Sequence, residues 1–416
     1  MLCAFCALVI LVSTVFPTAA FAEQPVDAAA AEQTLTRADA AEMQQTDAAV
    51  TALTESEQYQ EMDTDARKDV ALAQLDTLAA KGLVEKDSIY TDEENGMVSF
   101  RYPCGVLGGI LLTEPEDETL DEENAGTETA SNALSLRLPP DLGAEMQKSR
   151  AALLRRTENQ AVEKFGTAVI YYAFDNTINS SRFPYYSYMQ GFWSALGLET
   201  KINIHVTVAD LKKMGNFNVS VLSAHGSYYT YSYGKFLKRT RTEPIMLLTE
   251  ESTFGKDLRY GFDLLAHRVI KVNGMYCVTS DFFRNAYKGG KLSNTIVYSE
   301  TCEFLGVDGS EDNAMADALL SGGAQAVIGY VNNVYTVYSR SMLWDTINHL
   351  IMGQNVGQAL EHAKATYGED DLIWYHAQGG RRPHAAASYA VLYGNSQAAL
   401  HVPESNRSMF SVDLAA

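Results

Sequence analysis

Apolar residues in the C-terminal two thirds of the chain form short runs that alternate with segments of helical periodicity. Short apolar runs rich in β-branched residues are typical of strands buried in a parallel sheet. The pattern predicts strands over 167–174, 202–208, 219–224, 270–278, 295–298, 324–329 and 389–392. It predicts helices over 185–196, 209–214, 280–287, 313–321, 339–352 and 356–367, and a further helical segment over 142–164. Strands that alternate with helices indicate βαβ units, so the sequence predicts an α/β fold with a mainly parallel sheet.

The N-terminal third has a weaker apolar pattern. Residues 23–60 are rich in Ala, Glu, Gln, Asp and Thr, so we expect a disordered acidic segment there. Residues 61–113 predict a small α+β accessory domain or pro-domain. Its elements are a helix over 63–80 and strands over 88–91, 97–102 and 105–112, with Asn95-Gly96 as a turn.

Residues 227–268 interrupt the α/β alternation with a Tyr-rich stretch that predicts a hairpin. An alternating Tyr strand of this kind is either an amphipathic ribbon at a sheet edge or the wall of a peptide-binding cleft. The sequence leaves both interpretations open.

The beginning of the chain and one internal segment mark further boundaries. Residues 1–22 are mostly apolar and end in Ala20-Phe21-Ala22, which is typical of a signal peptide. We therefore expect a secreted or cell-envelope associated protein, with membrane contact only if the signal segment is retained. Residues 114–128 contain eight acidic side chains and no basic one, so we interpret 114–141 as an extended acidic linker. The main domain is then expected over 142–400 and a C-terminal tail over 401–416.

The formal net charge of −20 is concentrated in the N-terminal third. Residues 23–140 carry 26 acidic and 7 basic side chains, a net charge of −19, which leaves −1 for the rest of the chain. No basic face is indicated, so nucleic-acid binding is not expected. One hypothesis is that the acidic third is an inhibitory pro-segment attracted to basic residues at 235–241. The alternative is a spacer or a partner-binding module.

Removal of the signal segment would leave three cysteines, Cys104, Cys277 and Cys302. Three thiols cannot all pair, so at least one stays free. Cys277 belongs to an apolar run and is expected to be a small buried side chain. We expect Cys302 to be the free thiol.

Two predicted strands end in chemically active side chains. The strand over 219–224 is followed by His225, and the strand over 295–298 is followed by Ser299-Glu300-Thr301-Cys302. In open α/β sheets the active crevice lies at the carboxyl ends of the strands. If the two strands are neighbours, an imidazole and a thiol meet there, which is the minimum for a cysteine nucleophile with a general acid/base. Taken separately, each residue would be an ordinary buried side chain.

These stretches resemble the catalytic motifs of the caspase-like clan of cysteine peptidases, which includes caspases, legumains, clostripain and gingipains. His225-Gly226-Ser227 and Glu300-Thr301-Cys302-Glu303 are nearest to the legumain version, which has His-Gly-Ser and Glu-Ala-Cys-Glu. Residues 317–330 are similar to the helix and strand that follow the cysteine in bacterial members. The resemblance covers about 165–393. The chain departs from close relatives in the long interval between His225 and Cys302, which indicates an insertion.

The resemblance implies a caspase-like three-layer αβα sandwich and a cysteine endopeptidase that acts on a protein or peptide through a thioester. It implies that His225 and Cys302 are catalytic, with the cysteine at a strand-to-helix junction whose exposed N–H groups favour the thiolate. The N–H groups of Gly226 and Cys302 would hold the oxyanion, and Glu300 and Ser227 would bind substrate. A carboxylate at Glu300 is compatible with either Asn or a basic residue before the scissile bond. The alternatives are a catalytically silent binding module and a transpeptidase of the same fold.

The other histidines show no metal-ligand spacing along the sequence, so no zinc site and no cofactor are predicted. They are His205, His267, His349, His362, His376, His384 and His401. Some members of the clan bind calcium, but no EF-hand-like loop is present. The acidic stretch 308–312 is interpreted as a loop that caps a helix.

Overall fold

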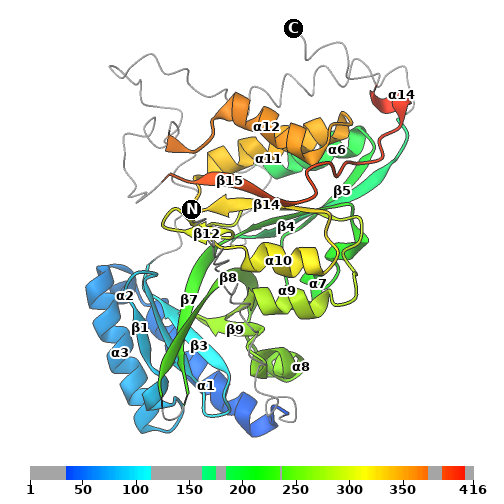
Figure 1. The fold of residues 1–416 in the computed structure, drawn as a ribbon. Coiled ribbons are helices and arrows are strands. Elements are labelled where there is room, and N and C mark those ends of the chain that lie inside the picture. The colour runs from blue at the N-terminus through cyan, green and yellow to red at the C-terminus, as the bar shows by residue number, and fades with distance from the viewer. Residues whose placement is uncertain (1–33, 114–161, 175–183, 235–236, 373–386, 408–416) are drawn as a thin grey trace, which may run out of the picture.

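The computed structural model describes residues 34–113, 162–174, 184–234, 237–372 and 387–407, which form two sheets with helices packed against them (Figure 1). The signal segment, the whole linker and most of the tail lie outside the described residues, as does most of the helical segment expected over 142–164. No helix within the described ranges combines the length and the apolar character needed to cross a membrane.

The larger part of the chain forms a six-stranded sheet. Its strand order is β15-β14-β11-β6-β4-β5, and all neighbours are parallel except β15, which runs antiparallel to β14. The strands are β4 (Gly166–Ala173), β5 (Leu198–Asn203), β6 (Val219–Ala224), β11 (Ile296–Ser299), β14 (Ala326–Val331) and β15 (Tyr389–Gly394). The mainly parallel sheet predicted from the apolar runs is confirmed.

Helices cover both faces of this sheet (Figure 1). On β4, Ile170 and Tyr172 face one helical layer, whereas Val169 and Tyr171 face the other, because successive side chains of a strand point to opposite sides. The first layer contains α6 (Pro184–Ala195), α11 (Thr336–Ile351) and α12 (Val356–Tyr367). The second contains α7 (Val208–Leu211), α9 (Ser280–Ala286) and α10 (Ala314–Ser321). Burial on both faces explains why the strands are continuous apolar runs.

A second sheet joins the N-terminal region to the insertion between His225 and Cys302. Its seven strands have the order β1-β2-β3-β9-β10-β8-β7, and all neighbours are antiparallel except β3 and β9. They are β1 (Tyr90–Asp92), β2 (Met97–Arg101), β3 (Leu107–Leu111), β7 (Gly226–Tyr233), β8 (Arg239–Glu251), β9 (Val269–Val272) and β10 (Met275–Thr279). The hairpin expected within 227–268 is β7–β8, and α8 (Phe254–Leu265) follows it.

The N-terminal region departs from two expectations. Residues 61–113 contain α3 (Thr64–Ala80) and β1–β3, but these strands do not form a sheet of their own, because β3 pairs with β9. Residues 23–60, expected to be disordered, contain α1 (Arg37–Thr54) and α2 (Glu57–Gln60). Thr36 and Asp39 form a capping box at the start of α1. The buried face of α1 is made largely of small and polar residues, so its apolar periodicity is weak in the sequence.

Two strand predictions were also wrong. The single strand expected over 270–278 is the hairpin β9–β10, which turns at Asn273-Gly274 with φ values of 49° and 76°. Asn-Gly is a strong signal for this type of turn, because both central residues need positive φ. The strand expected over 202–208 is β5, which begins four residues before the predicted start, at Leu198. The remaining elements are η2 (Lys86–Ser88), η3 (Met214–Asn216), β12 (Gly306–Val307), β13 (Ser310–Glu311) and α14 (Glu404–Arg407).

A buried ion-pair network fastens α1 to the second sheet. The Nζ atom of Lys271 on β9 lies 2.5 Å from Oδ2 of Asp47 on α1 and 3.0 Å from Oδ2 of Asp257 on α8. The hydroxyl groups of Tyr102 and Tyr276 donate to Asp47 and Asp257. Buried charges are tolerated only when they are paired and hydrogen-bonded, so the network couples α1 to α8 and β9, about 200 positions later in the chain.

Candidate active site

His225 and Cys302 follow adjacent strands. β6 and β11 are parallel neighbours, and Leu222 pairs with Ser299 at their carboxyl ends. The N–H of Glu300 continues this pairing by donating to the main-chain oxygen of Leu222 at 2.7 Å. Each candidate residue lies three positions beyond its member of the Leu222–Ser299 pair, so the sheet brings both to the same edge. The two strands are therefore neighbours, which is the condition that the sequence set for His225 and Cys302 to share one edge.

His225 lies beside the end of β4 and the middle of β8. Its ring packs edge-on against Phe174, which follows β4, with the centroids 4.7 Å apart and an interplanar angle of 86°. Its main-chain oxygen accepts a hydrogen bond from Leu247 of β8 at 2.9 Å. Burial lowers the pKa of the His225 imidazole to about 4. The ring is therefore neutral at pH 7 and able to accept a proton.

Gly226 is a point of close approach between the two motifs. A Cβ atom on this residue would lie 2.1 Å from the main-chain oxygen of Cys302, so only glycine fits. Gly226 pairs with Met246, and the bond from Leu247 N–H to His225 shows that this is a non-hydrogen-bonded pair of the antiparallel ladder. The N–H of Gly226 is consequently directed away from β8.

Cys302 is half-buried beneath the loop that follows β14. The N–H of Val334 donates to Sγ at 3.4 Å, and Sγ lies 3.8 Å from the main-chain oxygen of the same residue. The expected strand-to-helix junction is not present at this position. Cys302 begins a turn that leads into the β12–β13 hairpin, and α10 starts only at Ala314. A donor from the neighbouring loop therefore contacts the sulfur in place of a helix N-terminus.

The remaining cysteines fit a structural role. Cys277 is fully buried on β10, as expected, and burial raises the pKa of its thiol. Burial also raises the pKa of Cys104, which is half-buried. The structure shows no disulfide among the three cysteines of its described part.

Glu300 lies inside the protein below the strand ends. It is 4% exposed and accepts hydrogen bonds from the hydroxyl groups of Tyr186 at 2.9 Å and Ser339 at 3.4 Å. Burial raises the pKa of its carboxyl, and the nearby guanidinium of Arg340 opposes that effect. Arg340 is itself buried and lies over the rings of Tyr185 and Tyr186, 5.1 Å from each centroid.

Ser227, the other expected substrate-binding residue, lies on β7 opposite Ile245. Its hydroxyl donates to the main-chain oxygen of Tyr228 at 3.5 Å. The substrate-binding roles of Glu300 and Ser227 stay predictions.

Glu303 is a neighbour of the thiol that the sequence did not single out for a role of its own. It has a positive φ of 54°, and its N–H donates to the main-chain oxygen of Asn332 at 2.9 Å. Burial and the charge of Asp308 raise the pKa of Glu303 to about 7. Only the fold brings the loop after β14 over this residue, so no pattern in the sequence indicates the shift. Asp312, in the acidic loop expected to cap a helix, accepts from the N–H of Ala314 at the start of α10.

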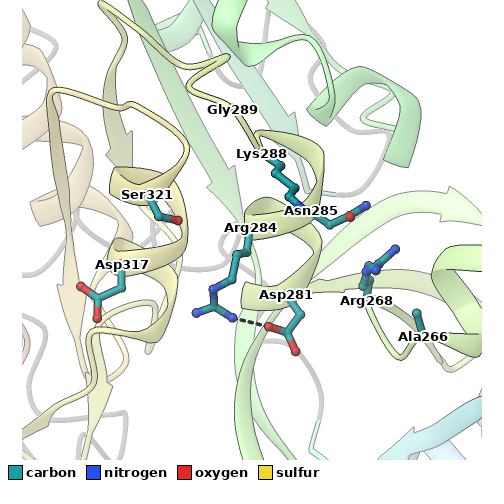
Figure 2. A pocket seen from close by; sticks show the side chains of 9 residues that line it. All are labelled: Ala266, Arg268, Asp281, Arg284, Asn285, Lys288, Gly289, Asp317 and Ser321. Carbon is teal, nitrogen blue, oxygen red and sulfur yellow. Dashed lines mark hydrogen bonds and ion pairs between the residues drawn. The ribbon is translucent and has the colours of Figure 1, made fainter. Parts of the chain in front are cut away.

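A cavity of about 620 Å³ opens elsewhere, beside α9 and α10 (Figure 2). Arg268, Arg284 and Lys288 supply positive charge to its lining, and Asp281 and Asp317 supply negative charge. Arg284 forms an ion pair with Asp281, as the dashed line shows (Figure 2). Neither His225 nor Cys302 lines this cavity, so it is separate from the strand-end site.

Comparison with protein families and with curated proteins identifies no relative of the chain. No model of a protein family matches the chain, and the search of curated proteins also gives no match. The functional argument therefore rests on the motifs and on the arrangement of the strands that carry them.

Proposed function

We propose that the protein is an exported cysteine endopeptidase with a caspase-like fold, in which Cys302 is the nucleophile and His225 the general acid/base. The observation that carries the proposal is the pairing of β6 with β11, in which each residue lies three positions beyond the Leu222–Ser299 pair. Five parallel strands with an antiparallel edge strand, covered by helices on both faces, support the caspase-like sandwich. The close approach of Gly226 to Cys302 supports a shared oxyanion site.

The chemistry follows from the neutral state of His225. The imidazole takes the thiol proton of Cys302, and the thiolate attacks the carbonyl carbon of the scissile peptide bond. The N–H groups of Gly226 and Cys302 stabilise the resulting oxyanion. Collapse of the intermediate breaks the C–N bond, and the imidazolium gives its proton to the leaving amine. Water then hydrolyses the thioester with His225 again acting as base.

The substrate in this proposal is a protein or peptide with Asn or a basic residue before the scissile bond. Glu300 is the residue that would favour either side chain, as a buried carboxylate beside Arg340 and Tyr186. A library of peptides that differ at this one position would distinguish Asn from Arg and Lys. The substitution Glu300→Gln should strongly reduce the preference for Asn or a basic residue at this position. It should have a smaller effect on the rate of cleavage of a peptide that carries neither.

Selective labelling of Cys302 tests the proposal. A peptide chloromethylketone should modify Cys302 and leave Cys277 unmodified, because Cys277 is fully buried on β10. Cys302→Ala and His225→Ala should each abolish peptide cleavage while preserving the circular dichroism spectrum, and Cys277→Ser should retain cleavage. Full activity of either of the first two variants would refute the assignment. A folded, unlabelled and inactive wild-type protein would instead favour the silent binding module, and ligation of an added amine would identify a transpeptidase.

A further inference from the structure

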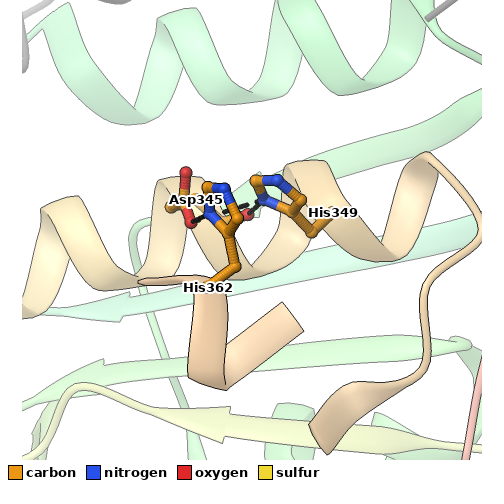
Figure 3. Close-up of side chains that lie close together, drawn as sticks. All are labelled: Asp345, His349 and His362. Atoms are coloured by element: carbon orange, nitrogen blue, oxygen red, sulfur yellow. Dashed lines mark hydrogen bonds and ion pairs between the residues drawn. The ribbon is translucent and has the colours of Figure 1, made fainter. Parts of the chain in front are cut away.

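The first helical layer of the six-stranded sheet carries a cluster of two histidines and one aspartate (Figure 3). Asp345 and His349 are four residues apart on α11, so they lie on the same face of the helix. His362 comes from α12 and reaches the same carboxylate. The sequence indicated no metal site, because the three residues belong to two helices and only the packing of α11 against α12 joins them.

The distances within the cluster are close to those of a metal site. The Nδ1 atom of His362 lies 2.8 Å from Oδ2 of Asp345, and Nδ1 of His349 lies 3.3 Å from the same oxygen. One ligand atom from each residue lies within 4.8 Å of the other two. Tetrahedral coordination with bonds of about 2.0–2.1 Å separates neighbouring ligand atoms by about 3.3 Å. A small outward shift of His362 would satisfy this spacing, and its side chain is 47% exposed.

Further contacts are made by the two histidine rings and by α11. The ring of His349 is buried, and its Nδ1 atom also lies 2.9 Å from the main-chain oxygen of Asp345, a contact that coordination of an ion through Nδ1 would replace. The rings of His349 and His362 lie with their centroids 3.7 Å apart and an interplanar angle of 32°, and Figure 3 shows both beside the carboxylate of Asp345. On the same helix, Asn348 accepts a hydrogen bond from the indole of Trp193 at 2.9 Å, which ties α11 to α6.

We propose that Asp345, His349 and His362 form a binding site for a divalent transition-metal ion of the Zn²⁺ class. Imidazole nitrogens favour zinc, copper and nickel, whereas calcium and magnesium prefer sites made of oxygen ligands. The partial exposure of His362 provides access for the ion and leaves space for water as a further ligand. A bound ion would crosslink α11 to α12 and so stabilise the layer that carries Ser339 and Arg340.

Metal titrations of the full chain test the site independently of peptidase activity. We would use a Cys302→Ala background, because a thiol beside an imidazole also attracts zinc. Co²⁺ should give the visible absorption of a four-coordinate ion at one equivalent per chain, and Zn²⁺ should displace it and raise the melting temperature. His362→Ala and Asp345→Asn should each weaken Zn²⁺ binding at least about tenfold.

The matched control is His205→Ala, which removes another exposed histidine and should leave Zn²⁺ affinity unchanged. Circular dichroism would verify that the His362→Ala chain is folded, as expected for a half-exposed side chain. Equal Zn²⁺ affinity with and without His362 would overturn the proposal. The proposal would also be overturned if the Cys302→Ala chain showed no saturable visible absorption with micromolar Co²⁺.

Discussion

The protonation state of His225 is set by its surroundings and not by the ordinary chemistry of histidine. Burial lowers the pKa of the imidazole from 6.5 to about 4, so the ring stays neutral through the mildly acidic range. If the neutral ring is the proton acceptor for Cys302, kcat/KM should be maintained below pH 6 and should fall only near pH 4. A pH profile of kcat/KM with a specific peptide substrate measures this acidic limb, the pH range in which kcat/KM falls. A limb centred at pH 6.5 would contradict the buried state of the imidazole.

Glu303 provides the control for that profile. The pKa of its carboxyl is about 7, and it adjoins the nucleophile in sequence, so its titration could modulate the rate near neutral pH. Glu303→Gln should remove any such inflection near pH 7 and leave the limb near pH 4 in place. Persistence of the inflection in this variant would show that it belongs to another group.

Gly226 gives a second prediction at the scale of one residue. Gly226→Ala places a Cβ atom 2.1 Å from the main-chain oxygen of Cys302, so the two strand ends have to separate. Loss of one oxyanion donor typically lowers kcat about a hundredfold or more, and we expect a decrease of that order. Gly255→Ala is the matched control, because a Cβ atom there meets nothing within 4 Å. Steady-state kinetics and thermal melts of both variants would separate an effect on the site from general destabilisation.

The sequence alone was enough to single out His225 and Cys302 as candidate site residues. His225 and Cys302 follow apolar runs that end abruptly, and strand ends of this kind are visible without a structure. The contacts of Val334 with Sγ and of Asn332 with Glu303 could not be predicted, because they come from a loop about thirty positions away in the chain. The cluster of Asp345, His349 and His362 was missed because its members belong to two helices that only packing brings together.

Helices and strands were predicted best where burial is strong and continuous. β6 and α12 begin and end at the predicted residues, and both carry a clear apolar pattern. The break between β9 and β10 was missed, although Asn273-Gly274 marks it, because apolar residues flank the turn on both sides. α1 was missed because its buried face is made largely of small and polar residues, with Asp47 paired to Lys271 on β9 and Gln44 donating to Asp257 on α8.

The buried lysine of β9 tests how firmly these elements are joined. Lys271→Ala would leave the carboxylates of Asp47 and Asp257 buried without their cation. Breaking one partner of a buried ion pair typically costs about 3–5 kcal/mol, and we expect the free energy of unfolding to fall by that amount. Lys86→Ala, which removes an exposed partner of Asp76, should change it by less than about 1 kcal/mol. Urea denaturation of both variants makes the comparison, and equal effects would show that the network is not coupled to stability.

At the scale of the whole molecule, the α/β class was predictable and the connection between the two sheets was not. Periodicity reports the local environment of a strand, whereas the pairing of β3 with β9 joins residues more than 160 positions apart. This pairing bears on the pro-segment hypothesis. Among the basic residues expected to attract an acidic segment, Arg241 is paired with Glu243 and Asp281, and Lys238 donates to the main-chain oxygen of Asp87.

Removal of the N-terminal region should therefore damage the fold and not release activity. A chain that starts near Asp141 would lose the partner strand of β9 and the carboxylate of Asp47. We expect this chain to be aggregated or poorly folded at low and high salt alike, as measured by gel filtration and by the rate of peptide cleavage. A soluble truncated chain that is more active than the long form would instead support the hypothesis of an inhibitory pro-segment.

The shared sheet also determines what a single backbone cut would do. Limited proteolysis within the acidic stretch 114–128 would divide the chain before β4, yet β3 would still be hydrogen-bonded to β9 and Asp47 still paired with Lys271. Denaturing electrophoresis should then show two fragments, whereas gel filtration should show one particle of unchanged size and activity. Maturation by such a cut would create a two-chain protein held together without covalent bonds. Both fragments would remain parts of the mature protein.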